Sequence, residues 1–307
     1  MTLPADHLEY PRRGHGQDMD RHDWQLAKDR KPIRLANGKD LAVMVVVNCE
    51  FHPINPSNTP FRHPAGMVTP WPDLRHFTSR DYGNRVGVFR ILDALKAHGL
   101  KATFPVSAAL LSRARPLIEA IAADGHEIAA AGLHGDAIHW SGLERDEENR
   151  RVETVRAAFS EAGLSPVTWM SPARQQSFAT PDILTAHGFT RTLDWETDQV
   201  PVPLRTDNGP LTALPLHNEL EDFKLLIERH QSEALWRDQI IEAKDFLIAE
   251  SQMRGAGVLG FTLTPFVTGQ PFRIWALREL LAALAGDERI WCAGADELAS
   301  AFGQIDP

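Results

Sequence analysis

The chain has 307 residues, of which 43% are hydrophobic and 24% are charged, and this is the usage of an ordinary globular protein. It excludes disordered, collagen-like and coiled-coil chains. The 41 acidic residues exceed the 32 basic ones, for a formal net charge of −9. Because nucleic-acid binders normally present a basic face, we expect no nucleic-acid partner. Two cysteines are too few for a disulfide framework or a four-cysteine zinc site.

The beginning of the chain differs in composition from the rest. Residues 1–40 are rich in charge, histidine and proline, and we expect them to form an arm on the surface of a single domain, residues 41–307. The N-terminal segment has no apolar core of the kind that a signal peptide needs. The longest apolar run, residues 41–47, is too short to cross a bilayer. We therefore expect a cytoplasmic protein with no membrane partner, which argues against secreted polymers as substrates.

Strand-like and helix-like segments alternate from residue 41 onward. Residues 41–47 form a continuous, β-branched apolar run, which is typical of a strand buried on both faces. Residues 85–99 carry most of their apolar side chains on one helical face and end at Gly99. Later segments continue this alternation, except for an irregular, proline-rich stretch from Val200 to Asp222. The pattern predicts an α/β fold with a parallel sheet that is closed, or nearly closed, into a barrel.

No dinucleotide-binding, P-loop, serine-hydrolase or zinc-protease motif occurs in the sequence. In parallel sheets the chemistry gathers at the carboxyl ends of the strands, so polar residues at those places are the candidates. The polar residues that fall at or near predicted strand ends are Asn48, Glu50, Arg80, Asp81, His134, Trp195, Glu219 and Thr264.

Glu50 and His134 are the two candidates for proton transfer. Glu50 closely follows an apolar run, and partial burial there would raise its pKa toward the range of a general base. Alternatively, this carboxylate caps the next turn or pairs with Arg80 or Arg85. His134 is titratable and has glycine neighbours, which would let a substrate approach closely. A single histidine in such a place is more often structural.

The remaining candidates also have plainer interpretations. Asp81 could be the N-cap of the helix that follows it. Trp169 and Trp195 are expected in the core or in a pocket wall rather than in catalysis. His134 and His139 are five residues apart, whereas two histidines on one helical face need a spacing of three or four. The residues alone therefore do not support a metal site.

Several segments resemble the NodB-like polysaccharide deacetylase superfamily. They include RDYGNRVGVFRILDALKAHGLKATFPVSAALLSRARPLIEAIAADGHEIAAAGLHG, WMSPARQQSFATPDILTAHGFTRTLDWETDQVPVPLRT, PLHNELEDF and TPFVTGQPFRIWALRELLA. The resemblance extends from about Leu41 to Phe302 and is nearest to the allantoinase-like branch, which hydrolyses cyclic ureides and imides. It implies a deformed (β/α) barrel and, often, a homo-oligomer.

The resemblance also shows departures at the residues that bind metal in other members. Their two adjacent aspartates, one a base and one a ligand, match Glu50 and Phe51. Their two ligand histidines match His134 and Ile138, and their late-strand histidine matches Thr264. Two of three ligands are therefore missing, which leaves no closed metal shell. An arginine of some relatives falls at Ala173, with Arg174 one position further on.

Our first hypothesis is a metal-independent hydrolase that cleaves a C–N bond of a small cyclic amide, imide or ureide, with no cofactor. Glu50 would activate water, and His134 would hold the carbonyl oxygen or protonate the leaving nitrogen. A small polar ring needs several convergent hydrogen-bonding groups. The candidates for substrate binding are Asn48, Asp81, Arg174, Trp195, Glu219 and Thr264.

Two alternatives stay open. One is a metal-dependent N-deacetylase of an acetylated sugar or amine, in which His134 and His139 would bind zinc or another divalent metal. It would take its third ligand from residues 52–76. The other is a non-catalytic member of the family that binds a small molecule, which Thr264 in place of the family histidine favours.

Overall fold

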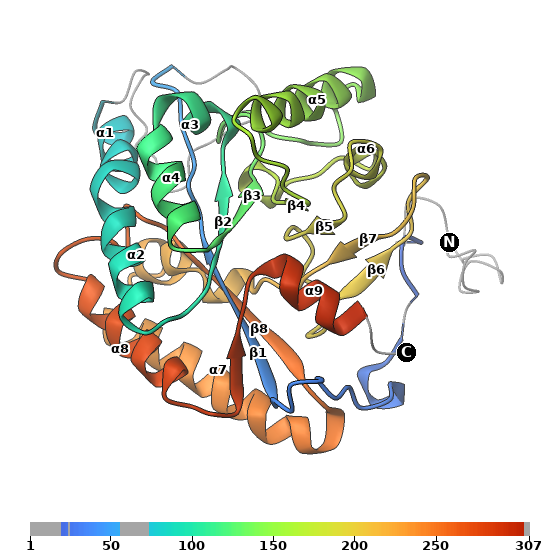
Figure 1. The fold of residues 1–307 in the computed structure, drawn as a ribbon, viewed down its shortest axis with the longest axis vertical. Helices are drawn as coiled ribbons and strands as arrows, with labels where there is room; N and C mark the ends of the chain where they lie inside the picture. The colour runs from blue at the N-terminus through green and yellow to red at the C-terminus, as the bar shows by residue number, and fades with distance from the viewer. Residues whose placement is uncertain (1–19, 24, 56–73, 304–307) are drawn as a thin grey trace, which may run out of the picture.

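A computed structural model describes residues 20–23, 25–55 and 74–303 (Figure 1). The described residues form one curled sheet of nine strands. The strands are β1 (Leu41–Val47), β2 (Thr103–Val106), β3 (Glu127–Ala130), β4 (Thr168–Trp169), β5 (Arg191–Thr192), β6 (Val202–Leu204), β7 (Leu211–Ala213), β8 (Gly257–Leu263) and β9 (Ile290–Cys292). Their order is β6-β7-β5-β4-β3-β2-β1-β8, with β9 paired to β1. This confirms the predicted α/β deformed barrel.

The α-helices follow the strands along the chain and mostly cover the outside of the curled sheet (Figure 1). They are α1 (Leu74–Tyr82), α2 (Val88–Ala97), α3 (Ala108–Arg113), α4 (Arg115–Ala123), α5 (Arg145–Glu161), α6 (Thr180–Ala186), α7 (Glu233–Arg254), α8 (Ile274–Ala285) and α9 (Ala295–Gly303). No helix in the described ranges is long and apolar enough to cross a membrane.

Short helical turns connect several of these elements. They are the 3-10 turns η2 (Ala27–Asp29), η4 (Pro172–Arg174) and η5 (Asn218–Leu220) and the π-helical turns η3 (Gly83–Gly87) and η6 (Phe223–Glu228). The turn η4 follows β4, and the turns η5 and η6 follow β7, so all three lie beyond the carboxyl ends of these strands.

The strand β1 pairs with β2, β8 and β9 and is buried on both faces. All seven of its side chains have 0% exposure. Alternate residues belong to two different apolar clusters: Val43 and Val45 pack with the outer helices, whereas Ala42 and Met44 pack with Leu298 of α9. Because successive side chains of a strand point to opposite faces, a continuous apolar run satisfies both clusters. The residues of β1 thus contribute only to the apolar core, and the polar residues of this segment come after the strand has ended.

The stretch from Val200 to Asp222 is more regular than the sequence analysis expected. It contains β6 and β7, which pair antiparallel, with Leu204 opposite Leu211. The prolines misled the prediction: Pro203 lies in β6, which is an edge strand. Proline lacks the backbone N–H, so it is tolerated on an edge where that group would have no partner strand.

A single helical run, α1, η3 and α2, precedes the second strand. Asp81 lies inside α1 and forms an ion pair with Arg85 at 3.1 Å, so its interpretation as the N-cap is wrong. The run turns π-helical at Gly83–Gly87, where it approaches the segment after β8. A Cβ on Gly87 would lie 2.0 Å from the backbone oxygen of Pro265, so only glycine permits this contact.

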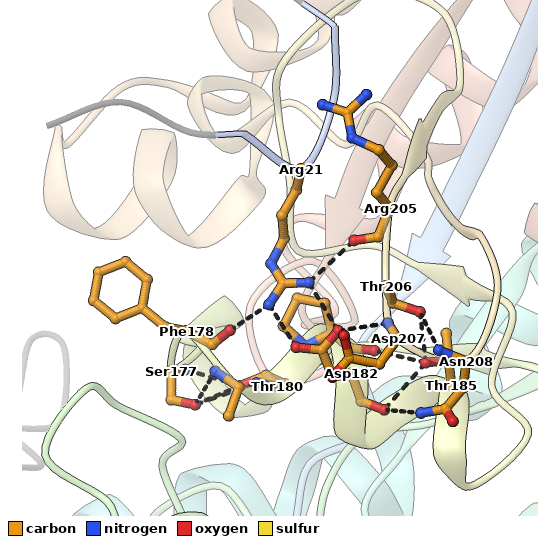
Figure 2. A network of polar contacts seen from close by, with 12 residues as sticks. Arg21, Ser177, Phe178, Thr180, Asp182, Thr185, Arg205, Thr206, Asp207 and Asn208 are labelled. Atoms are coloured by element: carbon orange, nitrogen blue, oxygen red, sulfur yellow. Dashed lines mark hydrogen bonds and ion pairs between the residues drawn. The ribbon is translucent and has the colours of Figure 1, made fainter. Parts of the chain in front are cut away.

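The described part of the arm, up to residue 40, lies against the domain (Figure 2). The Arg21 guanidinium donates to both carboxylate oxygens of Asp182, at 3.0 and 2.7 Å, and to the backbone oxygens of Phe178 and Arg205. Further along, Ile33 makes a parallel bridge with Gly255. Residues 1–19 lie outside the described residues.

Candidate functional site

A pocket of about 240 Å³ opens where β1, β4 and β8 end. This volume has room for a small ring. Its wall comes from segments that are distant in sequence but meet because parallel strands end at the same edge. The lining residues include Asn48, Glu50, His52, Arg80, Gly135, Arg174, Asn218, Glu221, Lys224, Glu228 and Thr264.

Glu50 lies in this pocket three residues beyond the end of β1. Its side chain is 22% exposed, so it can meet water, and its Oε2 is 3.3 Å from Nε2 of His52. Its backbone oxygen accepts a hydrogen bond from the Asn84 side chain at 2.8 Å. These contacts, together with the bridge of the preceding Cys49 to Val106, fix the direction of the segment after the strand.

The pKa of Glu50 is lowered, against the sequence expectation that burial would raise it. Burial does act upward, but hydrogen bonds from His52 and Asn48 and the nearby charge of Arg80 outweigh it. The general reason is that a carboxylate that accepts hydrogen bonds near positive charge is favoured in its ionised form. Glu50 is therefore a carboxylate at neutral pH.

His52 is a site residue that the sequence analysis did not single out. Its ring fills the space above Gly135, where a Cβ would lie 2.2 Å from the ring's Cε1. Gly135 is thus needed for the ring to reach Glu50. The sequence places a histidine two residues after a candidate carboxylate, and this spacing could have indicated His52. The segment is irregular, however, and without strand or helix periodicity the sequence does not predict which of its side chains converge.

Arg174 reaches the pocket from the turn η4. Both Ala173 and Arg174 have positive φ angles, 53° and 54°, which for such residues costs about 1–3 kcal/mol and is typical of functional sites. The turn is held by Asp194, which accepts from the backbone N–H and the hydroxyl of Ser171, both at 2.8 Å. The Nε of Arg174 is buried and has no hydrogen-bond partner among the described residues.

Thr264, which follows β8, is also in the pocket wall and is tied to Asp222. Its backbone N–H donates to both oxygens of Asp222, at 2.9 and 2.8 Å. The hydroxyl of Thr268 donates to the same carboxylate. Burial nevertheless raises the pKa of Asp222 to about 6.

Glu221 is a second carboxyl group of the pocket that the sequence analysis missed. Burial is the main reason that its pKa is raised to about 7, and the charges of Asp222 and Glu50 act in the same direction. It lies between two short helical turns, which carry no apolar periodicity. The available signal was the acidic cluster in HNELEDF, of which only Glu219 was considered.

His134 lies next to the pocket rather than in its lining. Its Nδ1 contacts Oδ1 of the buried Asp136, and its side chain is 33% exposed. The backbone turn brings Gly135 into the pocket wall instead. His134 follows β3 by four residues, and the direction of its ring could not be predicted from that position. Its catalytic role stays a prediction.

Three other predicted residues also lie outside the lining of this pocket. Asp81 pairs with Arg85 on the surface of α1. Trp195 donates its indole N–H to Gln176 at 2.7 Å and packs against the core. Glu219 pairs with the exposed Arg229 and lines a separate depression between η5 and α7. Of the predicted substrate-binding residues, the pocket thus brings together Asn48, Arg174 and Thr264 with Glu50.

The residues at the family's metal positions do not fit a metal ion. Phe51 lies under the guanidinium of Arg113, 4.7 Å from the ring centre, and Ile138 is buried. His139 is also buried and is held by Glu148 at 2.8 Å, so it is committed to a different contact. Over the described ranges, no three His, Cys, Asp or Glu side chains converge to hold a metal. The suggested third ligand from residues 52–76 largely concerns residues 56–73, which lie outside the described residues.

Comparison with known proteins identifies the fold. Residues 78–191 match the sequence profile of the polysaccharide deacetylase family. The structure of Puue allantoinase superposes with a TM-score of 0.77 at 21% identity, over 88% of this chain and 92% of that one. Two proteins classed as polysaccharide deacetylases also superpose. For the one from Mycobacterium smegmatis the TM-score is 0.72 at 24% identity, over 90% of this chain and 96% of that one. For the one from Pseudomonas aeruginosa PAO1 it is 0.75 at 20% identity, over 88% and 93%.

No curated protein matches the chain in sequence. The chain thus has the deformed-barrel fold of these structures, and its residues 78–191 match the polysaccharide deacetylase profile, as the sequence resemblance implied.

Proposed function

We propose that the chain is a hydrolase that cleaves a C–N bond of a small cyclic amide, imide or ureide without a metal ion. The observation that carries the proposal is the ionised, partly exposed Glu50 in a small pocket. At two of the three metal positions implied by the resemblance stand Phe51 and Ile138, which cannot act as ligands. The likeness to an allantoinase, an enzyme named for its action on a cyclic ureide, supports the same class of substrate.

The polar groups of the pocket are complementary to an amide edge. Asn48 contributes a side-chain amide and Arg174 a guanidinium group to its wall. An amide or imide offers an N–H donor next to a C=O acceptor, and side chains of these two types can pair with both. Recognition of a small polar ring needs such convergent groups, so this pair supports a ring with an amide edge.

In the proposed mechanism, Glu50 takes a proton from water while the water oxygen attacks the carbonyl carbon. His52 holds the carboxylate in place and keeps it ionised. Arg174 would stabilise the negative charge that develops on the carbonyl oxygen, because a donor already in place needs little reorganisation. His134 receives less support as the acid, since its ring contacts Asp136 and is not part of the pocket lining.

The test is a Glu50→Gln variant assayed on a panel of cyclic imides, ureides and amides. We expect a loss of about 10²–10⁴-fold in kcat, which is the usual contribution of a general base. Glu119→Gln is the matched control, because Glu119 is an exposed residue of α4 paired with Arg115. Wild-type protein that binds a ring in calorimetry but never hydrolyses it would replace this proposal with the small-molecule-binding alternative.

A further inference from the structure

The pocket contains a second carboxyl group whose position is fixed by its neighbour in sequence. Asp222 is fully buried. It accepts hydrogen bonds from the backbone N–H of Thr264, from the hydroxyl of Thr268 and from the backbone N–H of the next residue, Phe223. These contacts tie the segment between η5 and η6 to the end of β8. Because Asp222 is anchored, the adjacent Glu221 is held at the pocket wall.

The Glu221 carboxyl group faces a mixed set of charges. Asp222, Glu50 and Glu228 act on it as negative groups, and Arg174 acts as a positive one. Within the described part of the chain, it has no hydrogen bond or ion pair of its own. Lys224, which also lines the pocket, is paired with Glu228 at 3.7 Å. Glu221 is therefore the carboxyl group of this wall that is left open to a bound molecule.

Glu50 and Glu221 have opposite environments in one pocket. Glu50 accepts hydrogen bonds and lies near Arg80, which lowers its pKa. Glu221 is desolvated beside other carboxylates, which raises its pKa to about 7. Two carboxyl groups whose environments separate their pKa values can serve as base and acid at the same pH.

Resting on the hydrolase function above, we propose that Glu221 is the general acid that protonates the leaving nitrogen. Water attacks the carbonyl carbon, a C–O bond forms, and one water proton passes to Glu50. When the tetrahedral intermediate collapses, the C–N bond breaks, its electron pair goes to nitrogen, and the Glu221 proton is transferred to that nitrogen. The products are a carboxylic acid and a free N–H group, and solvent returns the proton from Glu50 to Glu221.

The other groups near the reacting bond are less suited to this role. Thr264 stands where the family histidine would be, but its backbone N–H is hydrogen-bonded to Asp222. A threonine hydroxyl is also far too weak an acid to protonate a nitrogen at neutral pH. His52 is positioned against Glu50. Glu221, which lies on a neighbouring segment, thus supplies the proton donor that the residue after β8 does not.

A Glu221→Gln variant tests the proposal through the leaving group. Substrates with a poorly leaving nitrogen, such as an unactivated cyclic amide, should lose about 10²-fold in kcat. Cyclic imides, whose nitrogen leaves readily, should lose much less, because they need little protonation. In wild type, kcat/KM should fall above about pH 7 as Glu221 ionises, and the variant should lack this alkaline limb.

Two further variants separate this role from a structural one. Glu221→Asp keeps the acid and should restore the alkaline limb together with part of the rate. Glu119→Gln, an equal change in charge on the exposed face of α4, should leave both the limb and the leaving-group dependence unchanged.

The outcomes also separate the two proposals. If wild type hydrolyses the panel and Glu50→Gln does not, but Glu221→Gln keeps the wild-type pH profile and leaving-group dependence, the acid role is wrong and the hydrolase function stands. If wild type hydrolyses nothing in the panel, both are wrong.

Discussion

At the residue scale, the state of Glu50 depends on His52. The contact between them, at 3.3 Å, is one of the influences that lower the Glu50 pKa below its ordinary value. A His52→Ala variant removes this contact, so the pKa of Glu50 should rise. Because the base must be ionised, the acid limb of the kcat/KM profile should shift to higher pH.

The measurement for this prediction is a pH profile of wild type, His52→Ala and His98→Ala. His98 follows α2, away from the pocket, and its removal should leave the profile unchanged. An acid limb that stays in place in His52→Ala would mean that Asn48 and Arg80 alone keep Glu50 ionised.

The protonation of Glu221 should also be visible in stability, without any substrate. Its pKa is raised from an ordinary 4.5 to about 7, so between these values the folded protein binds a proton that the unfolded chain has released. Stability therefore falls as pH rises through this window. Because glutamine mimics the protonated acid, Glu221→Gln should lack this loss and should gain stability relative to wild type as pH rises.

Urea unfolding of both proteins at pH 5 and pH 8 measures the difference in free energy of unfolding. Its change between the two pH values is the readout, and the same change for Glu119→Gln should be near zero. A difference that does not vary with pH would show that Glu221 is already ionised at pH 5.

At the scale of elements, the close approach of the helical run α1, η3 and α2 to the segment after β8 shapes the pocket. Arg80 comes from the helical side of this contact and Phe266 from the other, and the guanidinium lies 4.9 Å from the ring centre. A Cβ at Gly87 would lie 2.0 Å from the Pro265 backbone oxygen. Because the clashing atom belongs to the backbone, a change of side-chain rotamer cannot relieve the clash. Gly87→Ala should therefore destabilise the protein by about 1–3 kcal/mol and lower activity.

Gly303→Ala is the control for this substitution, because a Cβ there meets no atom within 4 Å at the end of α9. It should leave both the unfolding midpoint in urea and the activity close to wild type. If Gly87→Ala behaves in the same way, the helix can move away from Pro265 at no cost, and the contact does not shape the pocket.

The helices, strands and turns differ in how well the sequence predicts them. The apolar run of β1 predicts a strand buried on both faces, and its end correctly indicates where Glu50 lies, because strand periodicity is a local property. Periodicity does not predict η4, η5 and η6, which are short turns held by tertiary contacts. Arg174 and Glu221 enter the pocket from these turns, so Arg174 came only from the family resemblance and Glu221 was missed.

At the scale of the whole molecule, the apolar core and the candidate site occupy different parts of the curled sheet. The even-numbered side chains of β1 and the apolar face of α9 form one cluster, and Ile33 of the described arm packs against the same cluster. Arg21 attaches the arm to Asp182. Polar groups therefore collect at one edge, where β1, β4 and β8 end. A different reaction needs only different residues at that edge, which is why the same barrel supports metal-binding and other chemistry.

The last prediction concerns the metal requirement of the whole protein. Because Phe51 and Ile138 cannot act as ligands and His139 is bound to Glu148, activity should survive dialysis against a strong chelator, and the melting temperature should not change. Metal analysis of the purified protein should give much less than one zinc per chain. Stoichiometric zinc, with activity lost to chelator and restored by zinc, would instead support the metal-dependent N-deacetylase with a third ligand from residues 52–76. Hydrolysis of a cyclic imide or ureide by metal-depleted protein would leave the base role to Glu50.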